Sequence, residues 1–242
     1  MNARHSPARR HYLATVAAAA VVAQADGQLP DKATANAYEL MLMQLAEHRR
    51  RLKQVQSIER KIEAKRAFLP EYSSWVAGVL EGDRGGQDDV FVTVMVWMID
   101  TGDLAGALPL VDYALRHGLS MPDQYQRGIA CVAAEEFAEL ALKQIAAGAA
   151  PDVPSLLRVG ALTADHDMPD EVRAKLHKAI GYGLRDTDKP AALEHLVAAL
   201  KRHDKIGVKK DIERLEREIR NASPPADTGT PTNQAPADNG EG

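Results

Sequence analysis

Apolar residues recur three and four positions apart along most of this chain, which is the spacing of one face of a helix. The longest such run begins after Asp31, a good helix cap, and extends to about Ala67, because Pro70 disfavours helix in the residue before it. This register predicts one of two structures. The first is a coiled coil, in which the two polar a and d positions would fix the register and the oligomer state. The second is an amphipathic helix that packs on its own domain. The spacing does not choose between these two. The heptad a and d positions of this run are Tyr38, Met41, Leu45, His48, Leu52, Val55, Glu59 and Ile62.

Shorter helices joined by tight turns are predicted between residues 70 and 220. Small residues in the segment 104–117, and the pair of helices near the end of this region, give a pattern that resembles tetratricopeptide-like hairpins. Two such units are too few for a repeat solenoid, so a helical-hairpin body is expected. The predicted helices are 71–80, 87–100, 104–117, 129–147, 153–164, 169–184, 189–203 and 205–220.

The segment 87–100 is ambiguous, because its apolar run VFVTVMVWMI is rich in the β-branched residues that favour strands. Its length and the acidic pair Asp88 and Asp89 at its start fit a buried helix better, since acids in a first turn complement the helix dipole. The sequence also offers no second strand with which it could pair. The segment is therefore expected to be helical.

The N-terminal segment has two interpretations. Ser6 can cap a helix with Pro7 at its first position. Alternatively, the basic residues before the apolar stretch 12–23, with Ala23-Gln24-Ala25 as a cleavage site, resemble a secretory leader. The stretch is dominated by alanine and only weakly hydrophobic, which favours the helix.

The chain is therefore expected to be all-α and to have four parts. Residues 1–30 form an N-terminal arm with an Ala-rich helix, 31–69 a long basic helix with coiled-coil character, and 70–220 the helical body. Residues 221–242 contain no large apolar side chain, so they cannot offset their ordering entropy and should be disordered.

Charge is unevenly distributed. The chain has 30 Lys and Arg against 34 Asp and Glu, a net charge of −4, yet residues 47–66 contain eight Lys or Arg and three Glu. A local basic stripe is what a contact with DNA phosphates requires, whatever the total charge. A solvated helix face is the ordinary alternative. The predicted DNA-binding residues are Arg9, Arg10, Arg49, Arg50, Arg51, Lys53, Arg60, Lys61, Lys65 and Arg66.

Carboxylates offer the only candidates for a metal site. Asp83, Asp88 and Asp89 could hold Mg²⁺ as in two-metal nucleases, but each sits at a predicted helix end, where capping accounts for it. In the same way, Asp167 is expected to cap the helix that contains His177, although a metal site there is conceivable. The chain has no phosphate-binding loop and no nucleophile elbow, so no catalytic residue and no cofactor are predicted.

Two further features of the sequence exclude a disulfide-stabilised protein and a membrane-spanning protein from the expected classes. Cys131 is the single cysteine, so no internal disulfide framework is possible. No apolar stretch reaches the roughly 20 residues needed to cross a bilayer, so no membrane contact is expected.

Several strings of this sequence resemble the small terminase subunit, also called the terminase endonuclease subunit, of temperate tailed phages. The resemblance extends from Ser6 to about Glu218. The strings are SPARRHYLATVAAA, YELMLMQLAEHRRRLKQVQSIERKIEAKRAFLPEY, WVAGVLEGDRGGQDDVFVTVMVWMIDTGDLAGAL, YALRHGLSMP, MPDEVRAKLHK and GVKKDIERLERE.

The resemblance implies a protein of the host cytoplasm that recognises the packaging site on double-stranded viral DNA and assembles as a homo-oligomeric ring. It also implies a large terminase subunit as partner, which supplies the packaging ATPase and, in most systems, the nuclease. One departure is the tail, because relatives often end in a Lys/Arg-rich segment and residues 221–242 carry only acidic charges.

Three hypotheses follow. The first is a DNA-packaging subunit that binds DNA through the basic residues and regulates a large subunit. The second is an endonuclease that cuts DNA itself with Mg²⁺ at the acidic cluster. The third is a helical protein-interaction module in which the basic helix is only a seam between subunits.

Overall fold

A computed structural model describes residues 6–27, 29–122 and 126–222, and within them the chain is all-α. The predicted all-α class is confirmed within these residues, and the segment 87–100 is helical from Asp89 to Asp100. The predicted disordered tail lies outside the described residues, apart from residues 221 and 222, which end the last helix. The helices are α1 Pro7–Ala25, α2 Lys32–Gln54, α3 Ile58–Phe68, the 3-10 turn η1 Leu69–Glu71, α4 Ser73–Gly82, α5 Asp89–Asp100, α6 Leu104–Arg116, α7 Ile129–Ala146, α8 Val153–Leu162, α9 Asp170–Leu184, α10 Lys189–Arg202 and α11 Lys209–Ala222.

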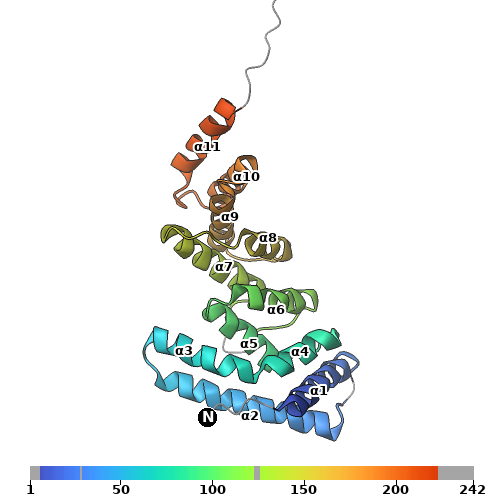
Figure 1. Ribbon diagram of the computed structural model, residues 1–242. Coiled ribbons are helices and arrows are strands. Elements are labelled where there is room, and N and C mark those ends of the chain that lie inside the picture. The colour runs from blue at the N-terminus through green and yellow to red at the C-terminus, as the bar shows by residue number, and fades with distance from the viewer. Residues whose placement is uncertain (1–5, 28, 123–125, 223–242) are drawn as a thin grey trace, which may run out of the picture.

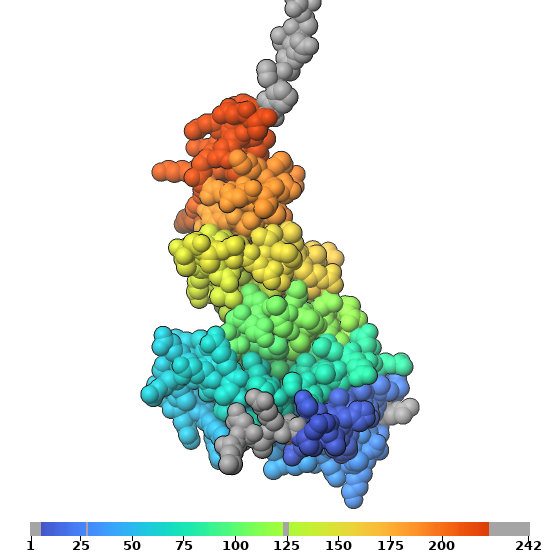
Figure 2. All heavy atoms as spheres, viewed as in Figure 1, coloured from blue at the N-terminus to red at the C-terminus, as the bar shows by residue number. Residues whose placement is uncertain are grey.

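The helices are stacked approximately in chain order, which makes the molecule elongated (Figures 1 and 2). Helices α1 to α4 form one end, α5 to α8 the middle, and α9 to α11 the other end. Helix α9 packs closely on α7 and α10, and α11 contacts α10. No helix within the described ranges is long and apolar enough to cross a membrane.

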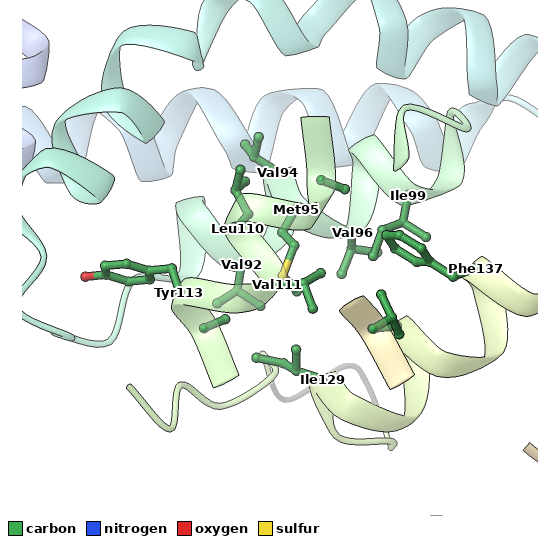
Figure 3. Packing of buried hydrophobic residues seen from close by; sticks show 14 of the residues in the cluster. Val92, Val94, Met95, Val96, Ile99, Leu110, Val111, Tyr113, Ile129 and Phe137 are labelled. Atoms are coloured by element: carbon green, nitrogen blue, oxygen red, sulfur yellow. The ribbon is translucent and has the colours of Figure 1, made fainter. Parts of the chain in front are cut away.

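Helix α5 lies at the centre of the stack. All residues from Val90 to Trp97 are buried, so its apolar surface is covered on every side. It contacts α2, α3, α4, α6 and α7. Figure 3 shows its side chains packed among those of α6 and α7. A helix that is apolar all round is stable only in such a position, because an exposed face would leave apolar surface in water. The tertiary environment therefore overrides the strand propensity of this segment.

The prediction of a single helix from Asp31 to about Ala67 is wrong, because the helix ends at Gln54. Val55 is extended, and the Ser57 hydroxyl accepts a hydrogen bond from the Arg60 N–H and so caps a new helix. Helix α3 then runs back alongside α2 as a hairpin (Figure 1). The heptad pattern therefore does not continue past the turn: Glu59 is exposed and belongs to another helix.

The buried face of α2 packs within the chain. Met41, Leu45 and Leu52 are buried, and His48 stacks on Phe68 with a ring separation of 3.8 Å. His48 Nδ1 also lies 2.8 Å from the Tyr72 hydroxyl oxygen. The heptad positions of α2 therefore form an amphipathic face against its own domain, the second of the two interpretations of this segment.

The Ala-rich N-terminal segment is a helix, and it begins as expected at Pro7, with the Ser6 hydroxyl accepting a hydrogen bond from the Arg9 N–H. This helix, α1, lies across α4 at very close range. A Cβ added to Gly78 would lie 2.0 Å from the backbone oxygen of Ala14, and one added to Gly82 would lie 3.1 Å from the Cα of Ala18. Small residues on both helices therefore allow their backbones to touch.

Gly78→Ala should destabilise the protein, because the new methyl group forces α1 away from α4. Overpacking of this kind costs about 1–3 kcal/mol, measurable as a lower midpoint of urea unfolding. Gly160→Ala in α8 is the matched control, since its Cβ would meet only the Ile180 Cδ1 atom at an ordinary 3.4 Å. The control should be neutral or stabilised by up to about 1 kcal/mol. Equal behaviour of the two variants would contradict the close contact.

Candidate nucleic-acid interface

The turn between α2 and α3 positions five of the ten predicted basic residues. The last two turns of α2 and the first turn of α3 meet there, so cations that are separated in sequence by the break are brought to one end of the hairpin (Figure 1). We call this group the hairpin cations, and it consists of Arg50, Arg51, Lys53, Arg60 and Lys61.

Three other predicted cations are engaged by α5 and its C-terminal end. Arg49 Nη2 donates a hydrogen bond of 2.6 Å to the Thr93 hydroxyl, and Arg66 Nη2 donates one of 2.8 Å to the carbonyl oxygen of Thr101. The Lys65 ammonium forms an ion pair with Asp100. These three side chains therefore help to hold the hairpin on the core, and Arg66 is still exposed. Their predicted contact with DNA stays a prediction.

The hairpin cations are exposed, except for Lys61, which is half-buried. Arg50 and Arg51 share one carboxylate, Glu47, at 2.5 and 3.0 Å. The hydrogen bond from Arg51 and the two positive charges lower the pKa of Glu47. Lys53 and Arg60 are exposed and have no ion-pair partner among the described residues. Exposed ion pairs are weak, so Arg50 and Arg51 remain available to a phosphate.

Arg9 and Arg10 form a separate group. Both are exposed in the first turn of α1. Helix α1 packs on α4 and lies away from the α2–α3 turn (Figure 1), so the structure does not join these residues to the hairpin cations.

The three aspartates considered as candidate metal ligands have different structural roles. Asp83 ends α4 in a left-handed conformation and accepts hydrogen bonds from Arg116 and His117, which lower its pKa. Asp89 is in the first turn of α5, and its N–H donates to the Tyr38 hydroxyl oxygen.

Asp88 is the buried member of this group. Its side chain is 2% exposed and caps α5, accepting hydrogen bonds from the Trp75 Nε1–H (2.7 Å) and the Phe91 N–H (2.9 Å). Burial raises the pKa of Asp88 to about 6, against the opposing effect of these hydrogen bonds. No three His, Cys, Asp or Glu side chains within the described ranges are grouped to hold a metal ion.

The acidic segment before α9 is not arranged as expected. Pro169, and not Asp167, occupies the cap position, and no side chain bonds the first turn. His177 instead pairs with His195 of α10 at 3.0 Å between Nδ1 atoms. Burial and the neighbouring His195 lower the pKa of His177 to about 4.

Sequence reasoning missed two features. One is the structural role of Arg49, for which the sequence held no signal, because Thr93 is distant along the chain. The other is an exposed apolar pair on α2, Leu40 and Met43, whose side chains are 64% and 68% exposed. A signal for this pair was present, since both residues lie outside the heptad a and d positions.

The chain is similar to known proteins over most of its length. A family model described as "Phage small terminase subunit" matches residues 42–171, which include most of α2, the hairpin turn and the core helix α5. A "Terminase, endonuclease subunit" of Escherichia phage P2 is 47% identical over 216 residues, which are 89% of this chain and 86% of the relative. No solved structure matches.

Asp88 should make the free energy of unfolding decrease as the pH rises. Its pKa is raised from 3.8 to about 6 in the folded protein, so the folded state holds the proton more tightly. The stabilisation this provides is complete below about pH 4 and lost as the pH rises through about 6, by up to about 3 kcal/mol.

Asp88→Asn removes this titration while keeping a cap oxygen for α5. Chemical unfolding between about pH 4 and 6 should show a less negative slope of stability against pH in the variant than in the wild type, whatever the difference in absolute stability. Parallel curves would show that Asp88 titrates normally.

Proposed function

This chain belongs to the phage small terminase subunit family, and on that premise we propose that it binds double-stranded viral DNA through the hairpin cations and presents it to a large terminase subunit for genome packaging. The family assignment confirms the resemblance seen in the sequence. The observation that carries the proposal is that Arg50, Arg51, Lys53 and Arg60 are exposed together at the hairpin turn, whereas Arg49, Lys65 and Arg66 are bonded to α5 and its C-terminal end.

The exposed set is suited to phosphate and not to reading bases. Its members lie on two antiparallel helices near the turn that joins them, so they place several positive charges at one end of the hairpin. Neutralising several phosphates releases condensed counterions, which gives affinity that depends strongly on salt and little on sequence. Arg9 and Arg10 would supply a second, separate contact.

A net charge of −4 does not oppose this role. At about 0.15 M salt the screening length is about 8 Å, so DNA at the hairpin turn senses mainly the local charge. Two acids of the middle helix α7 are partly neutralised, because Glu135 pairs with Arg127 and Lys175, and Glu139 pairs with Lys175.

Self-association would multiply this contact. A homo-oligomer, ring-shaped as the family resemblance implies, would present one copy of the hairpin cations per subunit to the same duplex, and linked weak contacts bind far more tightly than single ones.

The large terminase subunit is the proposed protein partner. The phage P2 relative is called an endonuclease subunit, and for this chain we assign DNA cleavage to the complex with the large subunit. The engagement of Asp83, Asp88 and Asp89 in local structure supports this division of labour.

Replacing Arg50, Arg51, Lys53 and Arg60 together by Gln should weaken DNA binding. If each contacts a phosphate, the slope of log affinity against log salt should become shallower by up to about 3.6, at about 0.9 per contact. Fluorescence anisotropy with a labelled duplex, from about 50 to 200 mM NaCl, measures this slope.

The matched control neutralises four exposed lysines at the other end of the molecule, Lys201, Lys205, Lys209 and Lys210. It changes the total charge equally but should leave the slope close to that of the wild type. An unchanged slope in the hairpin variant, or an equal change in both variants, would remove the hairpin cations from the proposal.

A further inference from the structure

An apolar groove opens beside the core on the side of α4 and α6. It has a volume of about 550 Å³ and runs between η1, α4, α5 and α6. Leu69, Leu80 and Met98 are only half-buried along it, and Ala77 is exposed. Arg66, held by the Thr101 carbonyl, lines it together with these residues. An apolar groove of this size is typical of a surface that receives a partner.

The opposite feature, an apolar ridge, lies on α2. Leu40 and Met43 are three residues apart and therefore adjacent on one face of the helix. They are 64% and 68% exposed, whereas Met41 and Leu45 on the other face are buried at 4% and 1%. Helix α2 forms the outer edge of the stack (Figure 1), so this ridge points away from the core.

We infer that the groove of one copy receives the Leu40–Met43 ridge of a second copy. The inference rests on the self-association in the proposed function and names the two surfaces that make it. Both surfaces are apolar, so their contact removes exposed apolar area of both copies from water.

Charge bears on the same pairing. Glu39 precedes the ridge, is exposed, and has no ion-pair partner among the described residues. Arg66 and Asp103 both line the groove and are exposed. Glu39 is therefore attracted by Arg66 and repelled by Asp103 across the contact, which helps to fix its register.

Other segments of this chain fit the apolar groove less well than the ridge of a second copy. Residues 223–242 contain no large apolar side chain to fill the groove. The ridge of the same copy is also unavailable, because the opposite face of α2 is fixed on the core through His48 and Leu45.

The ridge and the groove belong to different elements, so the contact is heterologous: each copy uses its ridge on one neighbour and its groove on another. Such a contact builds a closed ring if the rotation between subunits closes, and an open chain otherwise. Helix α2, with 23 residues, is about 35 Å long. It can therefore supply the roughly 800 Å² per partner of a stable interface, with the ridge at its apolar centre.

Two variants test the contact from its two sides. The ridge variant carries Leu40→Glu with Met43→Glu, and the groove variant carries Ala77→Arg, all at exposed positions. In native mass spectrometry the full-length wild type should be an oligomer and each variant alone a monomer. An equimolar mixture should form a dimer and nothing larger, because only the intact groove of the ridge variant can meet the intact ridge of the groove variant.

Several results would overturn the inference: a monomeric wild type, assembly of either variant like the wild type, or a mixture that stays monomeric. Leu157→Glu with Val197→Glu is the matched control, since these residues are also exposed and apolar, at 40% and 46%, and it should assemble normally. Circular dichroism excludes unfolding as the cause of any loss.

A second measurement covers the case in which a charged variant misfolds. Met43→Cys in one preparation and Ala77→Cys in another should be joined as a dimer by a short bismaleimide, while either preparation alone should not. The native Cys131 is buried and serves as the background control. Absence of the mixed dimer would also overturn the inference.

These outcomes are distinct from those of the proposed function. The ridge variant keeps the hairpin cations, so as a monomer it should still bind a short duplex weakly at low salt. The hairpin variant keeps the ridge and groove, so it should still assemble. Loss of DNA binding with normal assembly, or the reverse, shows which of the two ideas fails.

Discussion

The burial of α5 on all sides is the constraint on which the rest of the structure depends. Eight consecutive residues from Val90 to Trp97 are removed from water, which is possible only if neighbouring helices cover every face (Figure 3). Helices α2, α3, α4, α6 and α7 each contribute to that cover. A continuous helix over residues 31–67 would extend beyond this core, whereas the hairpin places both of its halves on α5. The chain therefore folds back at Val55, and Ser57 supplies the cap that makes the second half stable.

The same requirement divides the basic residues by function. Arg49, Lys65 and Arg66 lie on the side of the hairpin that faces α5 and its C-terminal end. They bind Thr93, Asp100 and the Thr101 carbonyl there, although Arg66 stays exposed. The hairpin cations lie beyond these contacts, and all of them except the half-buried Lys61 are exposed. A single basic stripe in the sequence thus becomes a structural clamp and an exposed cluster. The proposed function needs only the second of these, and the first holds it in place.

Carboxylates in this protein are explained by helix ends. Asp31, Asp88, Asp103, Asp152 and Asp188 each accept a hydrogen bond from the first turn of the helix that follows. An acid at this position satisfies a backbone N–H and complements the helix dipole. Asp88 differs in being buried, and its Trp75 partner ties the start of α5 to α4. Several of the aspartates that are close together in the sequence therefore mark helix ends, and the family assignment to a terminase subunit does not depend on a metal site in them.

The sequence by itself determined the all-α class, most helix boundaries to within a few residues, the caps at Ser6 and Asp31, and the family. These depend on periodicity, capping chemistry and local strings, which are properties of neighbouring residues. Only the tertiary structure decided that 31–67 is a hairpin, that the heptad face of α2 packs inward, and which cations stay exposed. Those outcomes depend on contacts between residues far apart in the chain, such as Arg49 with Thr93 and Lys65 with Asp100. Local spacing carries no information about such contacts, because they arise from the shared need to cover one apolar helix.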